Sequence, residues 1–294
     1  MANCLGVDIS VWSDQNSTSQ MFNPWKTRQR GGSFVGIKAT QANWIDPDFI
    51  MNWSNCKGVL YELPFHFLTW DVAPNRQAEV FWSVLEKNLH DGVLPLAVDF
   101  EWWSVEPNNA FDILYNFLEK MKTLAGPTMP QAIYSAKYFW NQFGTTADYW
   151  KQYHLWICDI TGVVEPVPPW MNNWTFHQYT FKLNGPEWGA ESLDLDGDYY
   201  NGTEADMVAE FHLGPLKDSI IPTPPPVTTK KYFIPYYSDL NIRSAPDTTK
   251  DNKVAKAIAG GENEVIDEKN SGGYNWISTE VWMATDGFGK FITK

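Results

Sequence analysis

Residues 94–103 of the chain read LPLAVDFEWW, an apolar stretch that closes on two carboxylates, Asp99 and Glu101. The apolar part has the length and composition of a buried strand. Burying an unpaired acid costs several kcal/mol, so two acids at the end of such a strand indicate a role other than packing. Residues two apart on a strand point to the same side, with Cα atoms about 6.6 to 6.8 Å apart. Both acids can therefore reach one ligand.

Seven further stretches of residues 1–216 have the character of strands and alternate with segments of helix length. Strands are expected at 4–10, 33–41, 59–68, 93–102, 130–136, 154–160, 175–181 and 192–198, and the clearest helices at 76–90 and 108–124. Repeats of strand, helix and parallel strand predict an α/β fold, an irregular TIM-like (β/α) barrel. The connections late in the chain look too short for full helices.

Polar residues interrupt the apolar strands near the ends where such barrels carry their chemistry. They are Asp8, Lys38, Gln41, His66, Asp99, Glu101, Gln178 and either Asp194 or Asp196. Carboxylates that converge on one mouth repel one another, which raises the pKa of at least one and keeps it protonated near neutral pH. A protonated carboxyl beside an ionised one suits glycoside hydrolysis: one acid protonates the leaving oxygen, and the other stabilises or traps positive charge at the anomeric carbon.

Other interpretations of these residues stay open. A Mg²⁺ or Ca²⁺ site would use the same acids, but no phosphate-cradling glycine loop accompanies them. Aromatic residues make up 16% of the chain, including 16 tryptophans, and sugar rings stack on such side chains. We therefore expect a sugar site with no metal and no cofactor. His66 is either a hydrogen-bonded core residue or a substrate contact, and Lys38 is either an ion-pair partner of the acids or a surface residue.

Charge and composition exclude several classes of protein. The net charge is −13, and residues 1–216 hold 12 Lys and Arg against 25 Asp and Glu. Nucleic acid is not an expected partner, because phosphate binding needs a basic surface. No run of 18 apolar residues and no signal-peptide pattern is present, so we expect a soluble, unexported chain that does not enter a membrane. Cys4, Cys56 and Cys158 are odd in number and widely spaced, which predicts reduced core residues.

A linker divides the sequence in two. Residues 217–230, KDSIIPTPPPVTTK, have neither helical nor alternating periodicity, and their prolines favour an extended spacer. Residues 231–294 contain short strand-like stretches separated by Gly, Asn and Asp, which predicts a small all-β barrel. We therefore expect a catalytic domain at 1–216, a linker at 217–230 and a second domain at 231–294.

The pieces of the first domain, taken in order, resemble family 25 glycoside hydrolases, the Chalaropsis-type lysozymes that phages and bacteria use to cut peptidoglycan. The resemblance covers most of residues 4–212 and rests on GVDIS, FVGIKATQ followed by DPDF, PFHF, LPLAVDFE, AIYS, LWIC, HQYT and DGDYYNGT. It implies that Glu101 is the general acid and base and that Asp99 orients the acetamido group or stabilises the charged intermediate. Asp8 and Asp196 complete the cluster, with Asp194 as the alternative to Asp196.

Further residues are candidates for binding the substrate. They are Asp194, Lys38, Gln41, His66, Trp102, Tyr134, Trp156, Gln178 and Tyr179. The chain departs from the family at Phe65, where a tyrosine is common, and at Ile160, where an aromatic residue is common. Both departures are expected to alter the walls of the substrate site rather than the acids.

The second domain resembles bacterial SH3-type modules. The stretch DLNIRSAPDTT (239–249) is similar to their signature strand and turn, and YNWISTEV (274–281) to their tryptophan-bearing strand. Such modules hold wall-lytic enzymes on the cell wall and raise their effective concentration there. Tyr236, Tyr237 and Trp276 are the candidate wall contacts, although Trp276 is equally compatible with the core of the small barrel.

Together these features predict an endolysin-like N-acetylmuramidase that hydrolyses, with retention, the β-1,4 bond between N-acetylmuramic acid and N-acetylglucosamine in peptidoglycan. We expect a monomer that stays in the host bacterial cytoplasm until a separate pore releases it to the wall. The nucleophile is either an enzyme carboxylate or the substrate's own acetamido oxygen. Two alternatives remain: a chitinase-like hydrolase, although Leu94, Leu96 and Ala97 replace the longer acidic run of chitinases, and a non-catalytic wall-binding protein.

Overall fold

The computed structural model describes residues 3–13, 22–101, 109–162 and 164–216, and beyond them the backbone of eight short strands. The chain divides into two compact units, residues Met1–Pro222 and Thr223–Lys294. The predicted linker contains the boundary between them.

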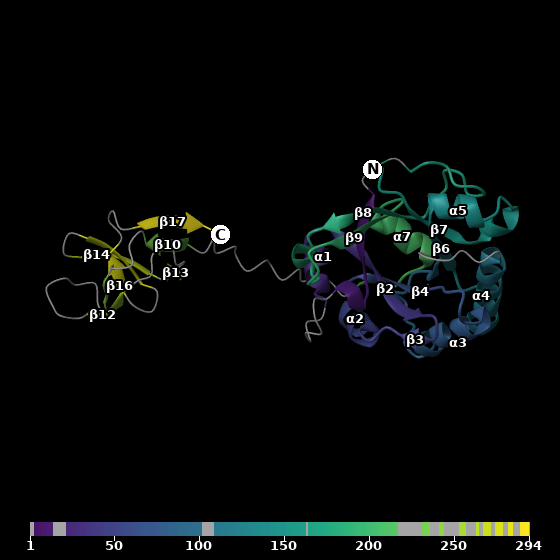
Figure 1. Ribbon diagram of the computed structural model, residues 1–294, viewed down its shortest axis with the longest axis horizontal. Helices are drawn as coiled ribbons and strands as arrows, with labels where there is room; N and C mark the ends of the chain where they lie inside the picture. Colours follow the sequence, from purple (N-terminus) through teal and green to yellow (C-terminus); the bar gives the residue numbers. More distant parts are fainter. Residues whose placement is uncertain are drawn as a thin grey trace. The chain divides into compact units, whose positions relative to one another are not determined.

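The first unit is a closed barrel of eight strands with helices around it (Figure 1). Its strands are β1 (Cys4–Ile9), β2 (Gly32–Gln41), β4 (Tyr61–Phe67), β5 (Leu96–Asp99), β6 (Gln131–Ala136), β7 (His154–Cys158), β8 (Phe176–Leu183) and β9 (Leu195–Tyr200). They follow the order β1-β9-β8-β7-β6-β5-β4-β2, and β2 pairs back to β1. A short strand, β3 (Trp44–Ile45), pairs with the end of β2. The predicted α/β barrel is confirmed.

The last strand departs from the predicted parallel order. The pairings from β1 through β2 to β8 are parallel, whereas β9 runs antiparallel to both β8 and β1. A parallel partner needs a crossover of about a dozen residues or more, usually a helix, and between β8 and β9 there is only the short helix α6 (Gly185–Trp188). The C-terminal ends of the parallel strands therefore meet the N-terminal end of β9.

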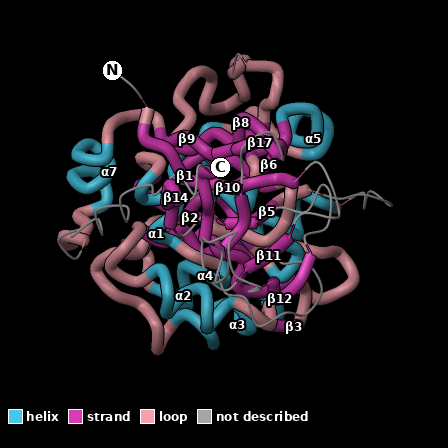
Figure 2. The backbone as a smooth tube through the Cα atoms, turned by 90° about the vertical axis from the view of Figure 1, so that its left-hand side faces the viewer, coloured by secondary structure: helices cyan, strands magenta, loops and turns pink. Residues whose placement is uncertain are grey.

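Helices surround the strands of the barrel (Figure 2). They are α1 (Pro24–Gln29), α2 (Phe49–Cys56), α3 (Pro74–Leu85), α4 (Ala110–Ala125), α5 (Lys137–Phe143) and α7 (Glu204–Phe211), with 3-10 turns at Val11–Ser13 and Asp148–Gln152. The two predicted helices correspond to α3 and α4, although α3 ends five residues early. The late connections are short, as expected. Among the described helices, none combines the length and the apolar character needed to cross a bilayer.

The core has two parts, because alternate residues of each strand face opposite sides. One set packs between the strands and the helices, and the other fills the barrel with rings such as Phe34, Trp156 and Phe176. The side chains inside the barrel leave no room for a Cβ atom at two positions, and both are glycines. A Cβ atom at Gly6 would lie 2.5 Å from the Phe34 ring, and one at Gly36 would lie 2.7 Å from the Cβ of Asp8.

The second unit contains two antiparallel sheets. Its strands are β10 (Lys231–Pro235), β11 (Asn241–Arg243), β12 (Lys253–Lys256), β13 (Asn263–Glu264), β14 (Asp267–Ser271), β15 (Tyr274–Ser278), β16 (Trp282–Ala284) and β17 (Gly289–Thr293), in the orders β13-β10-β17 and β12-β11-β16-β15-β14. Tyr236 and Tyr237 lie outside the described residues, and Trp276 is described by its backbone alone. The SH3-type module stays a prediction.

Candidate active site

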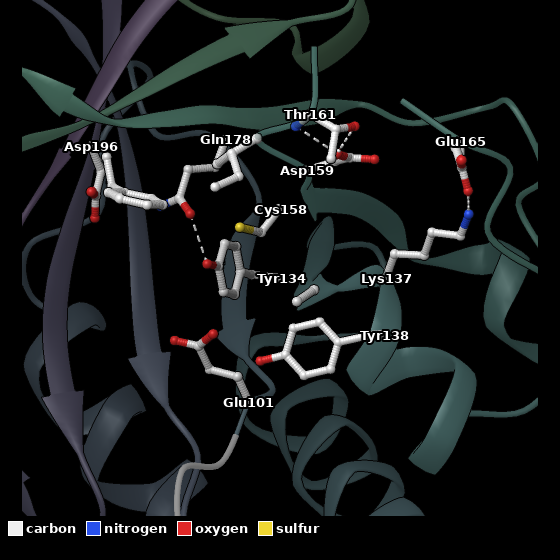
Figure 3. Close-up of a pocket in the computed structure, with 13 residues that line it drawn as sticks. Glu101, Tyr134, Lys137, Tyr138, Cys158, Asp159, Thr161, Glu165, Gln178 and Asp196 are labelled. Carbon is white, nitrogen blue, oxygen red and sulfur yellow. Dashed lines mark hydrogen bonds and ion pairs between the residues drawn. The ribbon is translucent and has the colours of Figure 1, made fainter. Parts of the chain in front are cut away.

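A pocket of about 660 Å³ opens at the mouth of the barrel (Figure 3). Its walls come from Glu101, two residues beyond β5, from β6 and α5, from the end of β7 and the segment after it, from β8 and from the start of β9. Among the residues that line it are Glu101, Tyr134, Tyr138, Gln178 and Asp196. The pocket therefore lies where the sequence predicted the chemistry, with β9 contributing its opposite end.

The two acids of the opening sequence both face the inside of the barrel. Ala97 belongs to the inner cluster, whereas Val98 and Phe100 pack in the outer one. The alternation directs Asp99 and Glu101 inward. Asp99 is 7% exposed, and its Oδ1 is buried without a hydrogen-bond partner among the described residues. Strand β5 ends at Asp99 rather than at the predicted residue 102, so Glu101 lies just beyond the strand, at the pocket wall.

Asp8 and Asp196 are brought together by strand register. They are direct partners across the antiparallel pair β1 and β9. Oδ2 of Asp8 accepts a hydrogen bond from Nε2 of Gln178 at 3.0 Å, and Oε1 of Gln178 accepts one from the Tyr134 hydroxyl at 2.9 Å. Tyr134 thus fixes which end of the Gln178 amide points at Asp8.

Strand β9, which carries Asp196, also carries a fifth acid of the site, Asp198, which the sequence analysis missed. Its side chain is fully buried, and its Oδ1 accepts a hydrogen bond from Nε1 of Trp156 at 2.8 Å. A signal for it was available, because Asp196 and Asp198 have the same two-residue spacing as Asp99 and Glu101.

Burial is the largest cause of the high proton affinity of these acids. It raises the pKa of Glu101 to about 7, and the charge of Asp196 adds to the shift while that of Lys38 opposes it. Burial also raises the pKa of Asp196 to about 8 and of Asp198 to about 7. The pKa values of Asp8 and Asp99 lie well above the ordinary range for the same reason. The raised values were expected, but mutual repulsion is the smaller contribution.

Lys38 is a buried cation of the site. It is 5% exposed, its Nζ donates to Oε1 of Gln41 at 2.5 Å, and it lies over the rings of Trp44 and Phe67 at 5.3 and 5.2 Å. Its charge lowers the pKa of both Asp99 and Glu101. This placement contradicts the surface interpretation and favours a partner of the acids.

His66 is not a substrate contact. Strand alternation directs it outward, where it is completely buried and stacks on Phe117 with ring centroids 4.9 Å apart. Its Nδ1 pairs with Oγ1 of Thr40 at 2.7 Å and its Nε2 with Oε1 of Gln77 at 3.0 Å. Burial lowers its pKa to about 3, so the ring is neutral. The core interpretation is the correct one.

Trp156 is also unavailable to a substrate, because it is 2% exposed inside the barrel. Asp194 lies outside the pocket: its exposed side chain pairs with Nζ of Lys182 at 2.8 Å, which leaves Asp196 as the acid of β9 at the pocket wall. Tyr179 stacks on Tyr199 with centroids 4.1 Å apart and does not line the pocket.

Trp102 lies outside the described residues. Cys4, Cys56 and Cys158 are free thiols, as predicted; Cys4 and Cys56 are buried, and Cys158 is half-buried against the core and also lines the pocket. Ile160 lines the pocket, as expected for a wall position, but Phe65 is buried inside the barrel.

The sequence analysis also missed the outer wall of the pocket. Tyr138 and Phe181 line it with exposed fractions of 69% and 44%, and an ion pair between Lys137 and Glu165 lies at its edge (Figure 3). The aromatic residue directly after AIYSAK was the available signal for Tyr138. Among the described residues, no group of three or more His, Cys, Asp and Glu side chains is arranged to hold a metal ion.

Comparison with known proteins agrees with this geometry. Residues 7–188, more than half of the chain, match the family described as Glycosyl hydrolases family 25. The fold is similar to that of the bacterial lysozyme from Streptomyces coelicolor, at 22% identity and a TM-score of 0.58 over 71% of this chain and 96% of that one.

It is also similar to a muramidase from Acremonium alcalophilum, at 23% identity and a TM-score of 0.56 over 71% of this chain and 98% of that one. The catalytic domain of an endolysin from a bacteriophage of Listeria monocytogenes matches at 16% identity and a TM-score of 0.52, over 71% and 97%. No curated protein matches the chain. These likenesses show a shared fold.

Proposed function

The chain belongs to glycosyl hydrolase family 25 and is therefore a glycoside hydrolase, and from this premise we propose that it is an endolysin-like N-acetylmuramidase. It hydrolyses the β-1,4 bond between N-acetylmuramic acid and N-acetylglucosamine in bacterial peptidoglycan, with retention of configuration. Solved proteins that are named lysozyme, muramidase and endolysin share its fold, which supports peptidoglycan as the substrate.

The single observation that carries the proposal is the wall shared by Glu101 and Asp196. Both carboxyls lie at one side of an open pocket, and Tyr138 faces them from the other side (Figure 3). A sugar ring bound in this pocket meets the two acids and the exposed Tyr138 side chain, whose hydroxyl points toward Glu101 (Figure 3). Such a site can protonate a glycosidic oxygen while it holds the ring by stacking.

Glu101 is the general acid in this proposal. Its pKa of about 7, raised chiefly by burial, leaves the carboxyl largely protonated in mildly acidic solution. It donates this proton to the leaving oxygen and then, as the carboxylate, removes a proton from the attacking water. The proton is thus returned to Glu101 at the end of the cycle.

Asp99 assists at the anomeric carbon. It shares the inward face with Glu101 and lies where the Lys38 charge lowers its pKa. In the proposal it either orients the substrate's acetamido group, whose oxygen then attacks, or stabilises the positively charged intermediate directly. In both routes Glu101 activates water on the side that the leaving group has vacated, so both retain the configuration.

The test is digestion of purified peptidoglycan, reduction of the new ends with borohydride and identification of the reduced sugar. Muramitol is the expected product, and Glu101→Gln, which has the same shape, is the matched control that releases none. Glucosaminitol would contradict the proposed bond specificity, and release of sugars from soluble chitin oligomers without wall digestion would favour a chitinase. Proton NMR of the anomer formed first tests retention.

We propose in addition that residues 231–294 form an SH3-type module that holds the enzyme on the wall through residues 217–230. The all-β strand pattern of this unit and its resemblance to such modules support the proposal. The test compares pelleting of the full chain with purified walls for Glu101→Gln and for Glu101→Gln combined with alanine at Tyr236 and Tyr237. Equal pelleting of the two proteins would contradict the assignment of these tyrosines.

A further inference from the structure

Asp198 lies two residues further along β9 than Asp196, deeper inside the barrel, and does not line the pocket. Its side chain has no exposed surface. A carboxyl group in such a place costs stability unless it carries a proton or has strong partners. The contacts of the Asp198 carboxyl therefore indicate its role.

One oxygen of Asp198 is held firmly. Oδ1 accepts the indole N–H of Trp156 at 2.8 Å. The indole is buried, and Phe65 and Tyr134 pack edge-on against it with centroids 5.8 and 4.9 Å away. Oδ2 is buried, and no N–H or hydroxyl group of the described residues donates to it. Asp198 thus has one satisfied oxygen and one open acceptor.

Asp8 is the group that can donate to this acceptor. Gln178 donates to Oδ2 of Asp8, which leaves Oδ1 as the better place for a proton. Asp198 is the cross-strand partner of Gly6, two residues before Asp8 on β1, so both carboxyls project from the same face of adjacent strands. The charge of Asp198 also raises the pKa of Asp8. The absence of a side chain at Gly36 provides the space, since a Cβ there would lie 2.7 Å from the Cβ of Asp8.

We propose that Asp198 is a positioning residue: anchored by Trp156, it holds a proton on Asp8, so that Asp8 meets the substrate as a neutral hydrogen-bond donor. The part that concerns the substrate rests on the proposed function. The negative charge of the pair then lies on Asp198, beside the indole N–H, rather than on Asp8.

The surrounding charges agree with this arrangement. After burial, the charge of Asp198 is the largest cause that raises the pKa of Asp8, and hydrogen bonds from Trp156 and Asp8 lower that of Asp198. The Lys38 charge acts instead on Asp99 and Glu101. The polar groups that interact with the pair come from β5 to β9. They are Asp99, Glu101, Tyr134, Trp156, Cys158, Gln178 and Asp196.

The experiment compares the full-length wild-type chain with Asp198→Asn. Asparagine keeps an oxygen for the Trp156 N–H but removes the charge. Carbon-13 NMR of aspartate-labelled protein should show Asp8 losing its proton at lower pH in the variant. We also compare the ratio of the wall-digestion rate at about pH 7.5 to the rate at about pH 5.5. This ratio should be about tenfold smaller in the variant than in wild type, which is the effect of lowering the pKa of Asp8 by about one unit. Asp194→Asn is the control. It removes an exposed carboxyl on the segment leading into β9 and should leave the Asp8 titration unchanged.

An unchanged Asp8 titration, or a loss of activity by the same factor at every pH, would overturn the proposal, because a purely structural role predicts that result. Trp156→Phe provides a second test if Asp198→Asn does not fold. It removes the N–H that stabilises the Asp198 anion, draws the proton toward Asp198 and should also lower the pH at which Asp8 ionises. The NMR readout needs no substrate, so it remains decisive even if the wild-type protein releases no muramitol.

Discussion

Replacing Asp196 by asparagine should make the protein more stable, and increasingly so as the pH rises. Burial, assisted by the charges of Asp8 and Asp194, raises the pKa of Asp196 from 3.8 to about 8. The folded protein therefore keeps a proton that the unfolded chain loses above about pH 4. Where the native state binds more protons than the unfolded state, the free energy of unfolding falls with rising pH. Asp196 thus costs stability progressively between about pH 4 and pH 8.

The size of this effect follows from the shift. About four pK units at 1.36 kcal/mol each correspond to roughly 5 kcal/mol at pH 8. Asparagine has the same shape and no charge, so Asp196→Asn should differ little from wild type near pH 4 and should gain up to that amount by pH 8. The gain should accompany a loss of wall digestion, since Asp196 lies at the pocket wall.

Urea unfolding followed by tryptophan fluorescence at about pH 4.5 and pH 8 measures the difference. Asp148→Asn is the matched control, because that carboxyl is exposed, is paired with Lys151 and is not among the charges that raise the pKa of Asp196. An exposed ion pair of this kind contributes about 0–1 kcal/mol. A variant at position 196 that is no more stable than wild type at pH 8, or that gains equally at both pH values, would refute the reasoning from burial.

Three further predictions concern activity and packing. Glu101→Gln should abolish wall digestion while the far-ultraviolet circular dichroism spectrum stays unchanged; an active variant would exclude Glu101 as the acid. The wild-type rate should fall as the pH rises through about 7, because Glu101 then loses its proton, and a rate still rising at pH 8 would contradict this role. His66→Ala should lower the free energy of unfolding by about 3 kcal/mol through a cavity and two unpaired partners but leave KM unchanged, and an altered KM would revive a substrate contact.

The acid cluster explains why such substitutions should separate stability from activity. Asp99 and Asp198 are buried, and each has an oxygen without a partner among the described residues. Packing alone would favour apolar or amide side chains at these positions. Buried ionisable groups that lower the stability of the fold are concentrated at functional sites, where the chemistry requires them.

Much of the site could be predicted from the chain itself. The two-residue spacing of Asp99 and Glu101 is enough to place both on one face, because the side-chain period of a strand is two whatever surrounds it. Apolar runs at regular intervals predicted the barrel, and barrels of this kind carry their chemistry at one end. The ordered motifs predicted the family, which the comparison confirms over residues 7–188.

Other features depended on contacts between distant segments. The period of a strand does not say which face is inside, so His66 could be assigned outward only when Phe117 and Gln77 were seen packed against it. The direction of β9 likewise depends on its pairing with β1 and β8. That antiparallel pairing brings Asp196 to the mouth, leaves Asp194 in solvent and buries Asp198 against Trp156. Local sequence therefore determined which residues share a face, and long-range strand pairing decided which of those faces met to form the site.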